Sequence, residues 1–228
     1  MKKKRNPGTI VLLIVTLSLI ISSGCKKEGD PGIIHDAGGN TYKSIIIGTQ
    51  TWMAENLKAT KYNDGSAIPN IRDSVKWASS YSPAYCWYRN DSTSNNSYGA
   101  LYNLFAVNSK KLCPTGWHVP TDTEWATLFD FLGGEPVAAN KLKEPGTTHW
   151  RSSYNEVTNE SGFTALPGGL RGLDGSFLSR TWYGYWWIAP YGAPDTGYTV
   201  CMSYEGGQIY PENFYERIAC SVRCIKNQ

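Results

Sequence analysis

The first 25 residues decide where this chain folds, and therefore which covalent links its fold can use. Four basic residues at 2–5 precede an apolar run of 12 residues at 10–21, and small residues at 22–24 lead to Cys25. A membrane-spanning helix needs about 20 apolar residues, whereas the apolar part of an export signal has about 7–15. We therefore expect residues 1–24 to be a cleaved signal that delivers the chain to an oxidising compartment.

Positions 22–25 resemble the lipobox of bacterial lipoproteins, whose cysteine becomes the acylated N-terminus of the mature protein. Ser22 stands where that pattern usually has leucine. The resemblance implies that Cys25 carries lipid and anchors the protein to the cell envelope, with the outer membrane as the expected location. Residues 26–30 loosely resemble the charged tags that follow the lipid cysteine in surface lipoproteins, which favours the exposed face, with the periplasmic face as the alternative. The alternative is an ordinary secretory signal cleaved near Ser23, with Cys25 an incidental thiol.

The net positive charge of the chain lies in the signal. The formal net charge is +3, from 22 basic and 19 acidic residues. Removing residues 1–24 takes away four cations and no anions, which leaves a net charge of −1. Because no basic stripe remains, we expect no nucleic-acid partner. Residues 25–36 are polar and predict a short tether, and residues 37–228 predict one domain.

Aromatic residues and glycine are abundant, with 9 Trp, 15 Tyr, 6 Phe and 23 Gly. This composition is typical of a loop-rich domain with a core of large rings. Residues 41–48 and 51–54 are short β-branched and aromatic runs that predict a hairpin. Further runs predict strands at 84–88, 163–166, 184–188, 198–203, 208–210 and 220–225. The pattern indicates an α+β fold of short antiparallel strands.

One segment carries the signals of an amphipathic helix. Thr121 and Glu124 have the spacing of a capping box, in which each side chain bonds to the other residue's backbone N–H. Residues 133–134 are a glycine pair that favours a helix end. We expect the main helix at 122–132 and a shorter one at 136–143. The apolar stripe of the main helix has the spacing i, i+3, i+4, i+7: Trp125, Leu128, Phe129 and Leu132.

Five cysteines remain beyond Cys25, and they are candidates for disulfides. Cys220 and Cys224 are four residues apart in a predicted strand, which puts their Cα atoms about 13 Å apart, beyond the ~7 Å that a disulfide allows. Each therefore needs another partner, although sequence leaves the connectivity open. Our first expectation is Cys113–Cys224 and our second is Cys201–Cys220. Cys86 would remain a buried thiol.

Candidate metal ligands and catalytic residues are sparse. The chain has no Cys-x-x-Cys pair and three histidines, so we expect no metal site and no cofactor. Glu160 with Asp174, or His118 with His149, are the possible acid–base pairs, and neither pair forms a known motif. We interpret His118 as structural and His149 as a loop residue without a partner. We therefore expect that the protein is not an enzyme.

Residues 113–125, with the sequence Cys-Pro-Thr-Gly-Trp-His-Val-Pro-Thr-Asp-Thr-Glu-Trp, resemble the core signature of the Fibrobacter succinogenes major paralogous domain family. Domains of this family are common in lipoproteins of Bacteroidetes and Fibrobacter relatives, and their function is essentially undefined. The resemblance continues, in family order, at 39–43, 51–57, 98–103, 159–169, 184–187 and 221–224.

The family is similar in turn to a wider fold group, the C-type lectin-like fold that it shares with formylglycine-generating enzymes (sulfatase-modifying factors). The similarity lies at 119–125, 166–171 and 222–224. It implies a C-type lectin-like fold. Formylglycine-generating enzymes hold copper with a cysteine pair, and Cys220 and Cys224 have nearly that spacing. Cys224, however, belongs to the terminal Val-Arg-Cys match, which argues against an enzyme of this type.

Six aromatic residues among positions 182–191 make this segment the candidate ligand surface. Alternation along a strand places Tyr183, Tyr185 and Trp187 on one face, and Trp182 and Trp186 on the other. One face would pack in the core while the other forms a platform for sugar or peptide; the alternative is that all of these rings are core. The full set of candidate contacts adds Tyr191, Arg171 and Asp174, with Glu205 and Asn213 nearby.

The expected function is a non-catalytic binding module for a glycan or protein ligand. The triplets Glu-Pro-Asn, Gln-Pro-Asp and Trp-Asn-Asp of calcium-dependent lectins are absent from the sequence, so binding is expected not to need calcium. The alternatives are a structural or adhesin-type surface component, and an enzyme on the formylglycine-generating fold.

Overall fold

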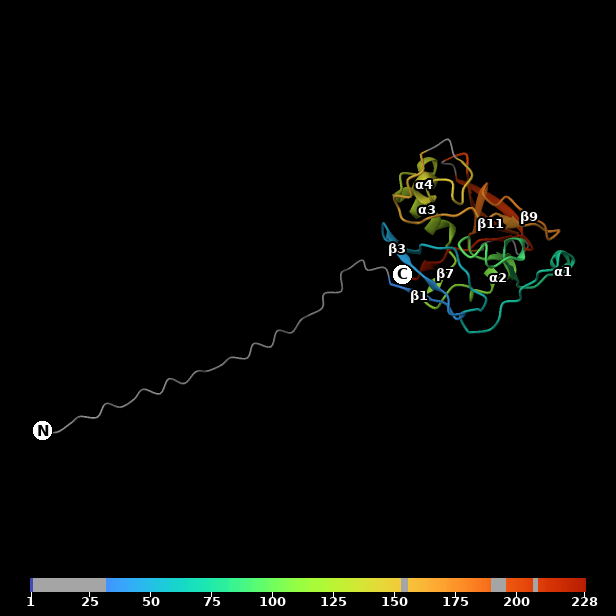
Figure 1. Ribbon diagram of the computed structural model, residues 1–228, viewed down its shortest axis with the longest axis horizontal. Helices are drawn as coiled ribbons and strands as arrows, with labels where there is room; N and C mark the ends of the chain where they lie inside the picture. The colour runs from blue at the N-terminus through green and yellow to red at the C-terminus, as the bar shows by residue number, and fades with distance from the viewer. Residues whose placement is uncertain (2–31, 153–155, 190–195, 207–208) are drawn as a thin grey trace. The chain divides into compact units, whose positions relative to one another are not determined.

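The computed structural model describes residues 1, 32–152, 156–189, 196–206 and 209–228 (Figure 1). Cys25 and Tyr191, for which the sequence predicts lipidation and ligand contact, lie outside these residues. The described part is an α+β domain whose strands pair antiparallel, as expected. Within it, no helix has both the length and the apolar character needed to cross a bilayer.

The domain begins earlier than the sequence indicates. Strand β1 (Ile34–His35) pairs with β2 (Thr41–Tyr42). Asp36 is buried and accepts hydrogen bonds from the Asn40 backbone N–H at 2.9 Å and from the Tyr42 hydroxyl at 2.7 Å. Residues 34–36 are therefore part of the fold, and the tether predicted for 25–36 is too long.

A four-stranded sheet brings the two ends of the domain together. Its order is β3 (Ser44–Ile47), β4 (Gln50–Met53), β14 (Ile225–Lys226) and β7 (Trp117–His118). The β3–β4 pair confirms the predicted hairpin, and the C-terminal strand lies between β4 and β7. The predicted Cys113–Cys224 disulfide ties the approach to β7 to the approach to β14, with the two Cα atoms 6.0 Å apart.

Two further sheets complete the domain. The first has the order β5 (Tyr85–Cys86), β6 (Leu101–Asn103), β13 (Ala219–Cys220), β8 (Leu170–Arg171) and β9 (Phe177–Leu178). The second has the order β10 (Tyr183–Trp187), β11 (Thr196–Ser203) and β12 (Ile209–Tyr215).

Two strand predictions are wrong. Residues 220–225 form two short strands, β13 and β14, which belong to different sheets. Residues 163–166 make only an isolated bridge, between Ala165 and Lys143. The chain cannot run straight there because Thr164 has a positive φ of 54°.

The main helix is confirmed as α3 (Asp122–Phe131), with the predicted capping box in place. The Thr121 backbone N–H donates to Glu124 Oε2 at 2.8 Å, and the Glu124 N–H donates to Thr121 Oγ1 at 3.3 Å. Helix α4 (Glu135–Leu142) follows it and contacts it (Figure 1). Two short helices were not expected: α1 (Ser74–Ser79) and α2 (Leu104–Asn108), capped by Asp73 and Asn103. A 3-10 turn, η1 (Tyr88–Asn90), lies between α1 and α2 in the chain.

Strand β10 lies between the two largest clusters of buried side chains. Tyr185 and Trp187 join one cluster, which includes the disulfide. Trp186 and Ile188 join the other, which includes Trp125 of α3. Both faces of β10 are therefore core, and this fact decides which aromatic residues remain available to a ligand.

Candidate binding site

The aromatic strand is not a platform. Tyr185, Trp186 and Trp187 are 8%, 0% and 0% exposed. Trp186 Nε1 donates to Asn56 Oδ1 at 2.9 Å, and Trp187 Nε1 donates to the Tyr102 carbonyl at 2.7 Å. The ligand roles predicted for these three residues are wrong, because both faces of β10 pack in the core.

The flanking residues Trp182 and Tyr183 are more accessible. Tyr183 is half-buried and stacks on Tyr185. Trp182 is 39% exposed, with the Arg151 guanidinium carbon 4.0 Å from its ring centroid. Tyr204 packs edge-on against the same ring. Trp182 is thus a surface residue whose ring already stacks with a cation.

The polar residues predicted beside that platform hold turns together. Arg171 is 1% exposed and donates to the carbonyls of Gly175 at 3.0 Å and Arg72 at 3.0 Å. It therefore has a structural role, and its predicted ligand role is wrong. Asp174 is exposed, and hydrogen bonds from the Ser176 side chain and backbone lower the pKa of its carboxyl group. They fix Asp174 within the turn between β8 and β9.

The second predicted disulfide does not form. Cys201 and Cys220 are free, buried thiols, as is Cys86. Tyr185 lies between the first two. It pairs with Cys201 on one side, and on the other its carbonyl accepts the N–H of Ser221, the residue after Cys220, at 3.0 Å. The strands that carry Cys201 and Cys220 are therefore two strand spacings apart, about 10 Å, which is too far for a disulfide. Burial raises the pKa of Cys86 and Cys201 to about 12, so these thiols are unreactive.

Both candidate histidines have carboxylate partners. His118 Nε2 lies 2.9 Å from Glu124 Oε1, and its Nδ1 lies 2.7 Å from Asn227 Oδ1, so His118 links the capping box to the C-terminus. His149 Nδ1 lies 2.7 Å from Glu144 Oε2, which corrects the expectation that it has no partner. Glu160 forms an ion pair with Lys141 at 2.9 Å. None of these contacts pairs His118 with His149 or Glu160 with Asp174.

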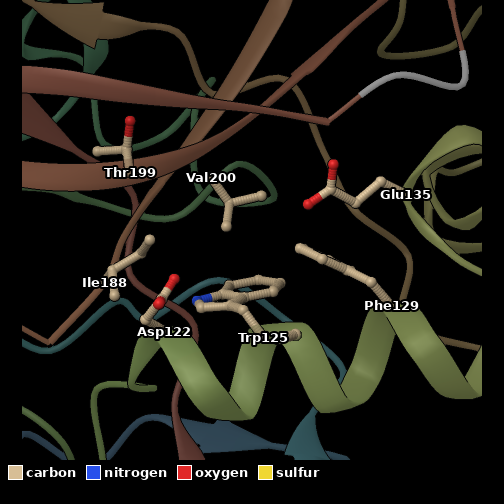
Figure 2. A pocket seen from close by; sticks show the side chains of 8 residues that line it. Asp122, Trp125, Phe129, Glu135, Ile188, Thr199 and Val200 are labelled. Carbon is tan, nitrogen blue, oxygen red and sulfur yellow. The ribbon is translucent and has the colours of Figure 1, made fainter.

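A pocket that the sequence did not indicate lies over α3 (Figure 2). We call it the Trp125 pocket; its volume is about 120 Å³. Its walls come from α3, the first residue of α4, and the β10–β11 sheet with the residue that follows β10. They are formed by Asp122, Trp125, Ala126, Phe129, Glu135, Ile188, Thr199 and Val200.

Two acidic side chains flank the floor of the Trp125 pocket. Figure 2 shows Asp122 on one side of the Trp125 ring and Glu135 on the other, with Val200 opposite the ring. Both carboxylates are exposed, and neither accepts a hydrogen bond or pairs with a cation within the described residues. Each lies in the first turn of its helix, where a negative charge is favourable.

The floor of the pocket has an unused hydrogen-bond donor. Trp125 is 1% exposed, and its buried Nε1–H has no acceptor among the described atoms. Trp52 and Phe129 fix the ring, with centroid separations of 4.8 and 5.7 Å. A buried donor left without a partner costs about 1–3 kcal/mol. This donor lies beneath the pocket surface, so the groups that a ligand can reach are the two carboxylates and the apolar walls.

A family model describes most of the chain: the Fibrobacter succinogenes major domain matches residues 45–226. The chain belongs to this family. No curated protein and no solved structure gives a significant match. The Trp125 pocket lies entirely within the Fibrobacter succinogenes major domain. The sequence does carry a signal for the two carboxylates: Asp122 begins the helix before the glycine pair at 133–134, and Glu135 begins the helix after it.

Proposed function

We propose that this chain is an envelope lipoprotein, anchored through Cys25, whose domain binds a protein ligand without catalysis and without calcium. The ligand inserts a lysine or arginine side chain into the Trp125 pocket. The observation that carries the proposal is the pair of carboxylates, Asp122 and Glu135, which lie on opposite sides of an aromatic floor and have no partner in the part of the chain that the structure describes.

The pocket suits a basic side chain in size and lining. A volume of about 120 Å³ accommodates one side chain. The methylene groups of lysine or arginine would contact Phe129 and Val200, while the cation lies between the carboxylates. Each exposed carboxylate would contribute about 0.5–1 kcal/mol.

A peptide fits better than a sugar. Sugar recognition by aromatic residues needs an accessible ring face, and Trp125 is 1% exposed. The ring faces of Trp186 and Trp187 are buried as well. A basic side chain needs only the exposed carboxylates and the apolar walls.

The finer fold assignment is part of this proposal. We infer a C-type lectin-like fold from the similarity at 119–125, 166–171 and 222–224. The pairing of the C-terminal strand β14 with β4 of the N-terminal hairpin, and the many loops between short strands, support it. An experimental structure whose closest structural relatives belong to another fold group would refute it.

The binding proposal is tested with the full chain in detergent micelles and an array of peptides that contain lysine or arginine. We expect binding that weakens with salt, and two- to fivefold weaker binding for Asp122→Asn or Glu135→Gln, the equivalent of about 0.5–1 kcal/mol. Asp130→Asn, an exposed change on the same helix outside the pocket, is the matched control. Binding of glycans with no binding of any basic peptide would refute the proposal in favour of a sugar ligand.

The anchor has its own test. Mass spectrometry of the mature protein should show an acylated N-terminal Cys25, and Cys25→Ser should release the protein from the membrane fraction. An unmodified N-terminus near Ser23 would favour the secretory alternative.

A further inference from the structure

A second cavity lies beside β3, an edge strand of the four-stranded sheet. Its volume is about 570 Å³, which is within the range of small-molecule sites, about 300–1,000 Å³. The lining combines apolar and polar side chains, among them Ile33, Ile45, Ala54, Lys43, Glu55 and Thr164. None of these residues lines the Trp125 pocket.

Two opposite charges line this cavity, the Lys43 ammonium and the Glu55 carboxylate. The Lys43 carbonyl accepts the Ala54 N–H at 2.9 Å, which places Lys43 opposite Ala54, the residue before Glu55, at the end of the hairpin. No ion pair joins Lys43 to Glu55 among the described residues. Glu55 Oε2 is buried and accepts no hydrogen bond within the described residues, and it forms an ion pair with Lys58 Nζ at 3.9 Å. The Glu55 side chain is nevertheless 37% exposed, so the accessible part of its carboxylate can accept from a donor that enters the cavity.

The opposite wall is held in a strained conformation. Thr164 has a φ of 54°, which is costly for a β-branched residue and which persists only where surrounding contacts enforce it. Asn159 supplies two of those contacts: its Oδ1 accepts the Thr164 N–H at 2.8 Å, and its Nδ2 donates to Thr164 Oγ1 at 2.9 Å. The fully buried Arg223 donates to the Thr164 carbonyl at 3.3 Å. The wall is thus pre-formed rather than adaptable.

We propose that this cavity binds a zwitterionic molecule of amino-acid to dipeptide size. The ligand ammonium donates to Glu55, its carboxylate pairs with Lys43, and its apolar side chain contacts Ile33, Ile45 and Ala54. A ligand of one charge would face repulsion from one of the two groups, whereas a zwitterion matches both. This site is separate from the proposed function, because the Trp125 pocket presents two carboxylates and no cation.

Isothermal titration calorimetry of the full chain in detergent micelles, with the dipeptide Leu-Leu as the probe, tests the proposal. We expect saturable binding that N-acetylation or C-terminal amidation of the dipeptide weakens by at least fivefold. Lys43→Met and Glu55→Gln should each weaken binding by at least fivefold. Lys61→Met, which removes an exposed cation outside the cavity, should not change it.

Two results would overturn the proposal. One is no binding of Leu-Leu at millimolar concentration. The other is binding that neither blocked terminus nor Lys43→Met changes; Lys43 is exposed, so this variant should fold even if Glu55→Gln does not. Asp122→Asn should leave Leu-Leu binding unchanged, so the two sites can fail independently.

Discussion

Replacement of Arg223 by methionine should destabilise the domain more than any surface change. Arg223 is 0% exposed, and no carboxylate pairs with it in the described part of the chain. Its guanidinium donates twice to Asn56 Oδ1, at 3.1 and 2.7 Å, and also to the carbonyls of Met53, Phe163 and Thr164. These bonds join the β4 end, the strained turn at Thr164 and the approach to β14.

The expected magnitude follows from these contacts. A hydrogen bond to a charged group contributes about 1.5–3 kcal/mol, but removing the guanidinium also removes its desolvation penalty. In the variant, Asn56 Oδ1 still accepts the Trp186 N–H, whereas each of the three carbonyls loses the hydrogen-bond donor that Arg223 supplied. A buried carbonyl left short of a donor costs about 1–3 kcal/mol; because the desolvation penalty of the guanidinium disappears as well, we expect a net loss of about 3 kcal/mol for Arg223→Met.

Urea unfolding with an unchanged m-value measures the loss. Lys226→Met is the matched control, because Lys226 is exposed and close in the chain, and it should change stability by less than about 0.5 kcal/mol. Arg223→Lys, which keeps the charge but loses the fork of donors, should fall between the two. A loss below 1 kcal/mol for Arg223→Met would refute the reasoning that this arginine organises the core.

Three further predictions follow from buried groups. Burial lowers the pKa of Lys143 to about 8. Between that pH and the usual pKa of lysine, the unfolded chain binds more protons than the folded chain, so the free energy of unfolding rises with pH. Urea unfolding at pH 7.5–10 should show this rise in the wild type and not in Lys143→Met. Replacing both Cys113 and Cys224 by serine removes a disulfide between residues 111 positions apart, and it should lower the free energy of unfolding by about 2–5 kcal/mol. A loss below 1 kcal/mol would contradict the structure. A thiol reagent should label no residue of the native domain, and after unfolding without reductant it should label three cysteines, found by peptide mapping: Cys86, Cys201 and Cys220.

Local signals in the sequence were sufficient for several elements. The capping box and the stripe after it define α3, because a helix end is stabilised by residues three or four positions apart. The β3–β4 hairpin has the same advantage, since its strands are neighbours in the chain. Excluding the Cys220–Cys224 pair on distance left the connectivity open; Cys113–Cys224 was the first expectation, and the structure confirms it.

Features that depend on distant neighbours could not be predicted. Whether Trp186 is exposed depends on α3 and on the 221–224 segment, which cover β10 from different parts of the chain. The Cys201–Cys220 prediction failed because it required knowing that Tyr185 lies between them. The Trp125 pocket needed the contact between two helices and β11, which no short pattern encodes.

The central claim is that a protein ligand occupies the Trp125 pocket. The most direct measurement is the indole N–H region of a nitrogen–proton NMR spectrum, with Trp125 assigned through Trp125→Phe, during titration with a lysine-containing peptide selected from the array. The account predicts that the Trp125 signal shifts and saturates while that of Trp186, already bonded to Asn56, stays in place. A peptide that binds while the Trp125 signal does not move would contradict it.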